Sequence, residues 1–428
     1  MKVETQVLHG YYRSDPATAA VAVPIYQTTA FLQGDIDHTA DIFNLRADGF
    51  TYTRILNPTT RVFEKRYAQL DGGVDSLATA SGQAATMAAI LNLCEVGDNI
   101  ISSPYLYGNT WNLFKHTFRR LGVEVRIADP RDPSSFRKLT DDKTKCYFGE
   151  VLANPLLIPF PIKQLAEIGD EYGIPVIVDN TITTMVCYPL KIGAAVSVYS
   201  ATKYIGGHGT TMAGLVVDGG KFDWKKKPER FPLLNNKDEA HNYKDWFKAT
   251  DLLDDLGCSA YLLKARMTWV RDTGACISPF NAFLMIQGLE TLPLRMERHC
   301  ENAENVAEYL KKHPKVERIV YPKYFQGWDK EVVTENFERT YGALIFFDIK
   351  GGIDAGMNFI RSLKLFYHVA NVGDARSLAT HPASTTHTTI PREKRIADGI
   401  NDGSIRLSIG IEHVDDLIAD IEQALLQA

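Results

Sequence analysis

Short apolar, β-branched runs alternate with stretches of helical period along most of the chain. The runs predict strands at residues 99–102, 123–127, 174–178, 196–199 and 213–217. Helices are predicted between and before them, among others at 63–70 and 84–93. Because strands that alternate with helices pair in parallel, the pattern favours a mainly parallel sheet with helices on both faces, an α/β fold.

The pattern is interrupted at two places. The first 61 residues are rich in Pro, Gly, Thr and Tyr and predict an extended arm. Residues 221–256 interrupt the alternation with charged and aromatic residues, which predicts a long insert rather than a domain.

A second, smaller α/β unit is predicted at the C-terminus. Helical residues 281–312 precede predicted strands at 316–321, 342–349 and 404–408. A chain of 428 residues is too long for one typical core, so two domains are expected. We therefore expect an arm, a large domain and a small domain at 1–61, 62–288 and 289–428.

Composition excludes several classes of protein. The 47 Lys and Arg against 52 Asp and Glu give a net charge of −5, which provides no general attraction to nucleic acid. No apolar run approaches the roughly 20 residues that span a bilayer, and no signal peptide is visible. The six cysteines are scattered, without the spacing of a zinc site or a disulfide framework, so no metal is expected. A cytoplasmic protein is the expectation.

Two predicted strands end in residues that carry chemistry. The strand at 174–178 runs into Asp179, and the strand at 196–199 runs into Ser200, Thr202 and Lys203. Ligands of such sheets bind at the carboxyl ends of the strands. A lysine buried there has a lowered pKa and forms a Schiff base with an aldehyde. Taken singly, Asp179 is also explained as an ordinary turn residue, and Lys203 as a lysine on the surface.

A third element is an anion site. Ser81, Gly82 and Gln83 open the apolar helix predicted at 84–93, where free amides and the helix dipole attract a phosphate. Taken alone, Ser81 is more often a plain helix cap.

Together the three elements match the requirements of pyridoxal phosphate. This cofactor needs an anion site for its phosphate, a lysine for its aldehyde and a carboxylate for its ring nitrogen. Nucleotide-binding motifs such as G-x-x-x-x-G-K-[ST] are absent, and no G-x-G-x-x-G follows a strand. A non-catalytic nucleotide-binding or regulatory α/β protein is the alternative from another class, and a colourless protein without an adduct on Lys203 would favour it.

The residues as a set resemble the Cys/Met-metabolism family of pyridoxal-phosphate enzymes, the cystathionine γ-synthase group, and most closely its O-acetylhomoserine sulfhydrylase branch. The similarity extends over nearly the whole chain. Its landmarks are Tyr52-Thr53-Arg54, Asn57-Pro58-Thr59, Ser81-Gly82-Gln83, Tyr107-Gly108, Glu150 with Asn154-Pro155, Asp179-Asn180-Thr181, Ser200-Ala201-Thr202-Lys203 and Arg406-Leu407-Ser408. The resemblance implies a fold type I transferase with a seven-stranded, mainly parallel sheet.

The resemblance also implies a role for each landmark. Lys203 would hold the cofactor and act as the base, Tyr107 would stack on the ring and relay protons, and Asp179 would pair with the ring nitrogen. Arg406 would bind the substrate carboxylate with help from Ser377 and Asn154. The phosphate would be held by Ser81, Gly82, Gln83, Ser200 and Thr202, with Tyr52 and Arg54 from a neighbouring subunit, and Asn154 would also contact the ring hydroxyl.

The implied reaction is a γ-replacement in methionine biosynthesis. O-acetyl-L-homoserine and a sulfur donor, either free sulfide or a sulfur-carrier protein, would give L-homocysteine and acetate. A homotetramer built from dimers with shared active sites is implied. The alternatives left open on the same scaffold are a cystathionine or methionine γ-lyase, a cystathionine γ-synthase, and an O-acetylserine sulfhydrylase.

Overall fold

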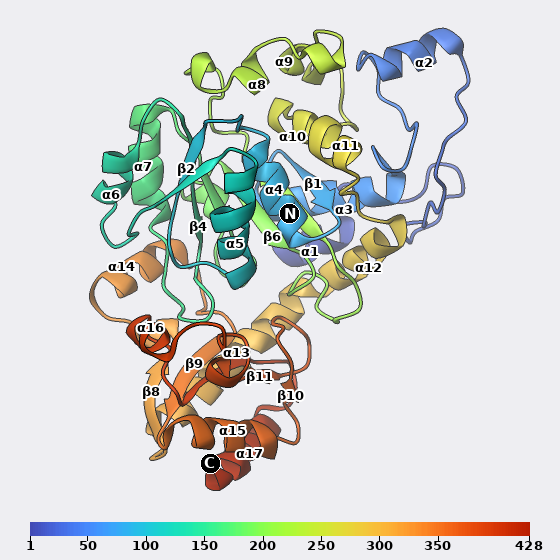
Figure 1. The fold of residues 1–428 in the computed structure, drawn as a ribbon. Coiled ribbons are helices and arrows are strands. Elements are labelled where there is room, and N and C mark those ends of the chain that lie inside the picture. The colour runs from blue at the N-terminus through green and yellow to red at the C-terminus, as the bar shows by residue number, and fades with distance from the viewer.

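A computed structural model describes residues 1–428 as two sheets with a long helix between them (Figure 1). The helices are α1 (Val3–His9), α2 (Ile36–Phe43), α3 (Pro58–Asp71), α4 (Gly82–Leu91), α5 (Gly108–Asn112), α6 (Ser134–Leu139), α7 (Ile162–Tyr172), α8 (Pro232–Asn235), α9 (Trp246–Thr250), α10 (Ala260–Ala265), α11 (Arg271–Thr273), α12 (Pro279–Glu290), α13 (Leu292–Lys312), α14 (Gly327–Asn336), α15 (Gly352–Ser362), α16 (Arg392–Ala397) and α17 (Val414–Gln427). The strands are β1 (Asp75–Thr79), β2 (Asn99–Ser102), β3 (Glu124–Ile127), β4 (Thr144–Glu150), β5 (Val176–Asp179), β6 (Val196–Ser200), β7 (Gly214–Asp218), β8 (Val316–Val320), β9 (Leu344–Ile349), β10 (Tyr367–His368), β11 (Leu378–Thr380) and β12 (Ser404–Ser408).

The larger sheet confirms the predicted class. Its seven strands follow the order β1-β7-β6-β5-β4-β2-β3, and only β7 runs against its neighbours. Successive residues of the strands enter different cores: Tyr147 and Val178 belong to one, and Phe148 and Ile177 to the other. Because a strand points alternate side chains to opposite faces, the sheet is covered on both sides.

Two strands of this sheet were not predicted, because each carries polar residues in a buried position. In β1, Asp75 is buried against Arg61, and the Ser76 hydroxyl donates to the Glu64 carbonyl over 2.7 Å. In β4, the Lys145 amine donates to the Arg230 carbonyl over 2.5 Å and lies 3.4 Å from Asp98. Their partners lie in other segments, so the hydrophobic pattern alone does not mark these strands.

The smaller sheet lies at the C-terminal end of the molecule, as predicted. Its order is β10-β11-β12-β9-β8, and all neighbours are antiparallel except β10 and β11. Helix α13 packs against β8 and α17, whereas α12 packs against α3 of the larger unit. The expected boundary at 288 therefore falls inside α12, two residues before it ends at Glu290.

The arm is less extended than predicted. It contains two helices, α1 and α2, and α3 begins at Pro58 rather than near residue 62. Asn57 caps α3 by accepting the Thr59 amide over 3.0 Å, with proline at the first helical position. These short helices escape prediction because isolated helices of this length are unstable without tertiary contacts.

The arm and the insert share a small core. Leu45 and Leu56 of the arm pack with Trp246, Leu253 and Leu256 of the insert. Trp246 is fully buried. The insert therefore packs on the arm through a shared core.

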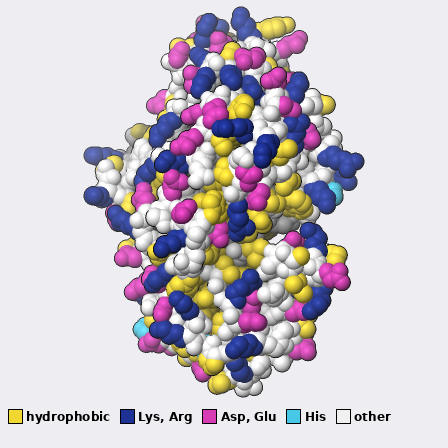
Figure 2. Space-filling view, turned by 90° about the vertical axis from the view of Figure 1, so that its left-hand side faces the viewer, with side chains coloured by type: hydrophobic (Ala, Val, Ile, Leu, Met, Phe, Trp, Pro, Cys, Tyr) yellow, Lys and Arg dark blue, Asp and Glu magenta, His cyan; other side chains and the backbone are white.

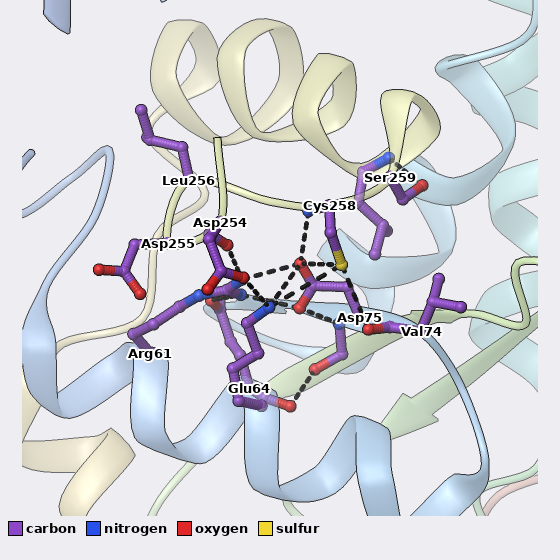
Figure 3. Close-up of polar contacts among 12 residues, drawn as sticks. Arg61, Glu64, Val74, Asp75, Asp254, Asp255, Leu256, Cys258 and Ser259 are labelled. Atoms are coloured by element: carbon purple, nitrogen blue, oxygen red, sulfur yellow. Dashed lines mark hydrogen bonds and ion pairs between the residues drawn. The ribbon is translucent and has the colours of Figure 1, made fainter. Parts of the chain in front are cut away.

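A buried ion cluster joins α3, β1 and the end of the insert (Figure 3). The guanidinium of Arg61 makes a two-point contact with Asp75, with both N–O distances 2.8 Å. Glu64 accepts from Arg61 over 3.1 Å and from Arg266 over 2.7 Å. Arg61 also donates to the Asp254 carbonyl over 3.0 Å, which fixes the insert on α3.

The charges of this cluster compensate one another. Burial by itself raises the pKa of Asp75, but the positive charges of Arg61, Lys65 and Arg266 bring it below its ordinary value. Asp75 is therefore ionised and holds Arg61 in place. A buried pair of this kind contributes little compared with apolar packing, but breaking it leaves a buried charge without a partner.

The outer surface mixes charges of both signs. In the view of Figure 2, Lys and Arg alternate with Asp and Glu over both lobes, while hydrophobic side chains gather near mid-height between the lobes. This face carries no continuous basic patch of the kind that binds nucleic acid. None of the helices is long and apolar enough to cross a membrane.

The ion cluster predicts a large effect of a small substitution. Replacing Asp75 by Asn should lower the free energy of unfolding by about 3 kcal/mol, because the buried cations Arg61 and Arg266 then share the single carboxylate of Glu64. The matched control is Glu171→Gln, which breaks an exposed pair with Arg137 and should cost less than about 1 kcal/mol. Denaturant unfolding of both variants measures the difference. If both variants lost the same free energy of unfolding, the buried cluster would contribute no more to stability than an exposed ion pair.

Candidate active site

One cavity of about 210 Å³ lies where the larger sheet faces β12 of the smaller one. Both sheets and the loops after their strands contribute to its wall. The lining residues are Ser81, Gly82, Gln83, Thr86, Tyr107, Glu150, Leu152, Asn154, Asp179, Thr181, Ile182, Ser200, Thr202, Lys203, Met212, Ala370, Asn371, Val372 and Arg406.

The cavity floor is formed by the carboxyl ends of three adjacent parallel strands. Glu150 ends β4, Asp179 ends β5 and Ser200 ends β6. Glu150 and Asp179 are direct partners in the register of β4 and β5. Strand register therefore places these polar side chains side by side, as expected for a ligand site at this edge of an open α/β sheet.

The N-terminus of α4 meets the end of β6 without intervening space. Ser81 caps the helix, with its hydroxyl accepting the Ala84 amide over 3.2 Å. A Cβ added at Gly82 would lie 2.6 Å from the Ser200 Cβ. Glycine is therefore required for this approach, which brings the free first amides of α4 next to the Ser200 hydroxyl. This geometry suits an anion.

Lys203 follows β6 and lies mostly buried in the cavity wall. Its amine donates to the Asn371 side-chain oxygen over 2.5 Å. Burial, and after it the positive charge of Arg406, lower the pKa of Lys203. A larger fraction of this amine is neutral, and so nucleophilic, at neutral pH than for an ordinary lysine.

Arg406 lies in β12 and is buried without an acidic partner. Its guanidinium donates to Asn154 Oδ1 over 3.2 Å, to the Asn371 carbonyl over 2.9 Å and to the Thr380 hydroxyl over 3.2 Å. Its Nε makes no hydrogen bond, and burial lowers its pKa to about 10. Because this buried cation lines the cavity and is held only by neutral oxygens, it suits an anionic ligand group.

Asp179 is the opposite case, a buried carboxylate without a cation. It accepts the Thr181 amide over 2.8 Å, and burial raises its pKa above the ordinary value. Thr181 in turn accepts the Ser200 amide through its hydroxyl over 2.8 Å, which ties the ends of β5 and β6 together. A cationic ligand group would compensate the charge of Asp179.

Tyr107 and Asn154 lie above these strand ends. Tyr107 precedes α5 and is 45% exposed, so its ring is available to the cavity rather than buried in a core. Its hydroxyl accepts from Asn109 over 3.0 Å. Asn154 lies in the loop after β4, where its side chain meets Arg406.

Ten of the residues selected from the sequence line this cavity. They are Ser81, Gly82, Gln83, Tyr107, Asn154, Asp179, Ser200, Thr202, Lys203 and Arg406.

Three other selected residues do not line it. Tyr52 and Arg54 lie in the arm, where Arg54 contacts the Tyr52 ring and the Arg271 carbonyl. Ser377 is fully buried, donates to Glu412 over 2.8 Å and accepts the Gly410 amide over 2.8 Å. The hydroxyl of Ser377 joins the start of β11 to the segment after β12, and Asn371 is the residue that contacts Arg406 in this structure. The role of Ser377 at the substrate carboxylate stays a prediction.

Two residues that line the cavity have no role predicted from the sequence. Asn371 contacts both Lys203 and Arg406, but it lies in a loop without a recognisable motif. Glu150 is one of the landmarks of the resemblance, but its place at the end of a strand is not visible in the sequence because β4 itself is not predicted.

The residues present fit pyridoxal phosphate. The cavity offers a glycine-lined helix N-terminus for the phosphate, a buried amine with a lowered pKa, and a buried carboxylate that lacks a cation. These match the three polar parts of the cofactor, namely its phosphate, its aldehyde and its ring nitrogen. Fold and site together define a pyridoxal-phosphate enzyme of fold type I. The structure contains no group of three or more His, Cys, Asp or Glu residues placed to hold a metal ion.

Comparisons identify the family. The family model described as Cys/Met metabolism PLP-dependent enzyme matches residues 4–426, and the chain belongs to this family. It is 45% identical over 428 residues to the O-acetyl-L-homoserine sulfhydrylase of Leptospira meyeri, with 99% of this chain and 96% of that one covered. It is 42% identical over 424 residues to the homocysteine synthase of Schizosaccharomyces pombe, with 99% and 97% covered.

A solved structure agrees with this assignment. A putative O-acetylhomoserine (thiol)-lyase of Campylobacter jejuni superposes with a TM-score of 0.93 at 36% identity and covers 100% of both chains. That structure contains N'-pyridoxyl-lysine-5'-monophosphate. The protein is therefore a pyridoxal-phosphate-dependent enzyme that acts on a small amino-acid substrate.

The electrostatics of the site predict a measurable coupling between two of its cations. Arg406→Gln removes a positive charge near Lys203, so the pKa of Lys203 should rise. Labelling the apoprotein with an amine-reactive reagent over a pH series, with the Lys203 peptide quantified by mass spectrometry, measures the midpoint. Arg137→Gln, on the surface, is the control and should leave the midpoint unchanged. A midpoint that falls in Arg406→Gln would contradict the coupling.

Proposed function

We propose that this enzyme catalyses a γ-replacement in methionine biosynthesis, in which O-acetyl-L-homoserine and a sulfur donor give L-homocysteine and acetate. The C–O bond at Cγ breaks and acetate leaves with its electron pair. The donor sulfur gives up a proton and forms the new bond to Cγ. Full-length relatives from several organisms carry the names O-acetyl-L-homoserine sulfhydrylase or homocysteine synthase, which supports this reaction over the other chemistries of the family.

One observation supports the site assignment above all others. The buried guanidinium of Arg406 has no acidic partner and is held beside the Lys203 amine by Asn371. An α-amino acid carries a carboxylate and an amine on one carbon, so it can meet both groups at once. A two-point contact between guanidinium and carboxylate would fix the orientation of the substrate.

The remaining residues would hold and orient the cofactor. Pyridoxal phosphate, when bound, supplies an aldehyde for the substrate amine and a ring that accepts electrons. Asp179 would face the ring nitrogen, and Tyr107 would cover the ring. The phosphate would lie at the start of α4, among Ser81, Gly82, Gln83, Ser200 and Thr202, while Asn154 would reach the ring hydroxyl.

Lys203 would then carry protons. With its lowered pKa, the amine takes the proton from Cα of the substrate and moves protons between Cα and Cβ. Asn371 holds the amine through a single hydrogen bond, which leaves it free to swing between these atoms. The Tyr107 hydroxyl would relay a proton toward the departing acetate.

We further propose that the enzyme is a homotetramer built from dimers that share active sites. Tyr52 and Arg54 lie outside the cavity of their own chain, and would complete the phosphate site of a neighbour. The arm also exposes large apolar side chains, with Leu32 at 99% and Ile36 at 86% exposure. Such side chains are more often covered by a partner than left in water.

The division of the chain, the location of the protein and its sulfur source are part of the same proposal. An arm at 1–61, a large domain at 62–288 and a small domain at 289–428 describe the units, with α12 extending the large one to residue 290. We propose a cytoplasmic enzyme that uses free sulfide. A sulfur-carrier protein is the second source, and an assay with each donor separates them.

Lys203→Ala tests the proposed reaction. Homocysteine formation from O-acetyl-L-homoserine and sulfide should fall by more than about a thousandfold, because both the amine and the base are lost. Lys330→Ala, on the exposed side of α14, is the control and should keep full activity. O-succinylhomoserine, O-acetylserine, cystathionine and methionine, each with and without sulfide, should react more slowly with the wild-type enzyme. Faster turnover of any of them would replace the proposed substrate.

A complementation experiment tests the shared site. Arg54→Ala and Lys203→Ala should each have low activity alone. If Arg54 serves the neighbouring cavity, random mixing of the two chains forms mixed dimers with one intact site, and about a quarter of wild-type activity returns. Co-expression with two affinity tags, followed by the sulfhydrylation assay, measures the recovery. No recovery in purified mixed dimers would place Arg54 at the site of its own chain.

A further inference from the structure

Glu150 is a buried carboxylate in the cavity wall to which none of the roles above is assigned. It ends β4 directly beside Asp179, its register partner at the end of β5. Its exposed fraction is 7%, and it lines the same cavity as Lys203. A buried acid at a reaction site needs hydrogen-bond partners and a resolved charge state.

The two oxygens of Glu150 bind two different loops. Oε1 accepts the backbone amide of Tyr107, at the start of α5. Oε2 faces the backbone amide of Asn154, in the loop after β4, over 3.4 Å. One side chain therefore fixes the two segments that carry the residues expected at the ring face and the ring hydroxyl.

The charge around Glu150 is unbalanced. Asp179 faces it from β5, and the two strands lie about 4.8 Å apart. The cations of the cavity are engaged elsewhere, since Lys203 donates to Asn371 and Arg406 donates to Asn154, Asn371 and Thr380. Tyr107, from α5, is the remaining titratable group at the cavity.

Two adjacent buried carboxylates do not both ionise without a cation between them. Burial, followed by the negative charge of Asp179, raises the pKa of Glu150 to about 8. Backbone amides stabilise negative charge on both residues, those of Tyr107 and Asn154 on Glu150 and that of Thr181 on Asp179, but only Asp179 has in addition a side-chain contact, with the Thr181 hydroxyl. The pair thus carries one negative charge near neutral pH, and that charge belongs to Asp179.

We propose that Glu150 is a positioning residue that stays protonated, holds the Tyr107 and Asn154 loops against β4, and leaves Asp179 as the one negative charge facing the ring nitrogen. The longer contact, at Oε2, suits the protonated oxygen. The inference rests on the proposed roles of Tyr107, Asn154 and Asp179, and is independent of the sulfur donor. Glutamine has the shape of protonated glutamate and keeps an acceptor for the Tyr107 amide, losing only the long contact to the Asn154 amide. Glu150→Gln should therefore preserve most of this function, whereas Glu150→Ala should not.

Cofactor binding provides the first test. Apoprotein of each variant is titrated with pyridoxal phosphate and followed by the absorbance and circular dichroism of the bound cofactor. Glu150→Gln should bind within about threefold of wild type with the same dichroic band, while Glu150→Ala should bind at least about tenfold more weakly with an altered band, because both loop contacts are lost. If both variants bound the cofactor equally weakly, the negative charge of Glu150 would be needed for binding. If Glu150→Ala bound the cofactor like wild type, the positioning of the two loops by Glu150 would not be needed. Either result overturns the proposal.

The pH dependence of stability provides the second test, which needs neither cofactor nor substrate. The pKa of folded Glu150, about 8, lies above its ordinary value of 4.5, so the folded state binds more protons between these pH values. Stability of wild-type apoprotein should therefore fall relative to Glu150→Gln as pH rises from about 5 to 8. Denaturant unfolding over this range measures the difference. No relative fall would mean that Glu150 is ionised, and this conclusion would hold even if Glu150→Ala failed to fold.

Asp71→Asn is the matched control. Asp71 is also a buried carboxylate, and burial raises its pKa to about 7, but it lies at the end of α3 and accepts from Tyr199 outside the cavity. Its replacement should change the pH dependence of stability and leave the dichroic band of the cofactor unchanged. A changed cofactor band in Asp71→Asn would show that the band responds to the loss of any buried carboxylate. The band would then no longer support a positioning role of Glu150. The proposed γ-replacement is assayed separately, so its failure would leave these readouts intact.

Discussion

The hydrogen-bonded register of the parallel strands β4, β5 and β6 is the constraint on which the site depends. Parallel strands end at a common edge, so a side chain that follows each strand is brought into one row. Glu150, Asp179 and Ser200 occupy that row, and Lys203 follows one turn later. A shift of one residue in any pair would turn these side chains to the opposite face and disperse the site.

The second requirement is a rigid wall against this edge. Helix α4 approaches so closely that Gly82 has no room for a Cβ against Ser200. Across the sheet, the cluster of Arg61, Glu64 and Asp75 joins α3 to β1, the strand that leads into α4. An unpaired buried charge is strongly destabilising, so only the arrangement of α3, β1 and the insert in which these charges pair is stable. Arg406 and Asp179 have no partner of opposite charge, and both line the cavity, where a ligand would compensate them.

Sequence patterns predicted most of the fold and most of the site. The five predicted strands of the large sheet and the three of the small sheet all exist, within about two residues. Strands β1 and β4 were missed because Asp75 and Lys145 break the apolar pattern, and only partners distant in sequence make their burial possible. Ser377 does not line the cavity, because its hydroxyl contacts Glu412 and Gly410, and Asn371 contacts Arg406 although no motif marks it.

The sequence by itself determined the chemistry of this protein. A lysine and an aspartate that each follow a predicted strand, together with a helix N-terminus that opens on small residues, indicate a pyridoxal-phosphate site, because these features depend only on local order along the chain. The tertiary structure decided which charges remain uncompensated. Arg406 comes from the small sheet and Asn371 from a loop 168 residues after Lys203, and burial depends on what packs around a side chain. The tertiary structure was therefore needed to show that Arg406 has no acidic partner and that Glu150 lies beside Asp179.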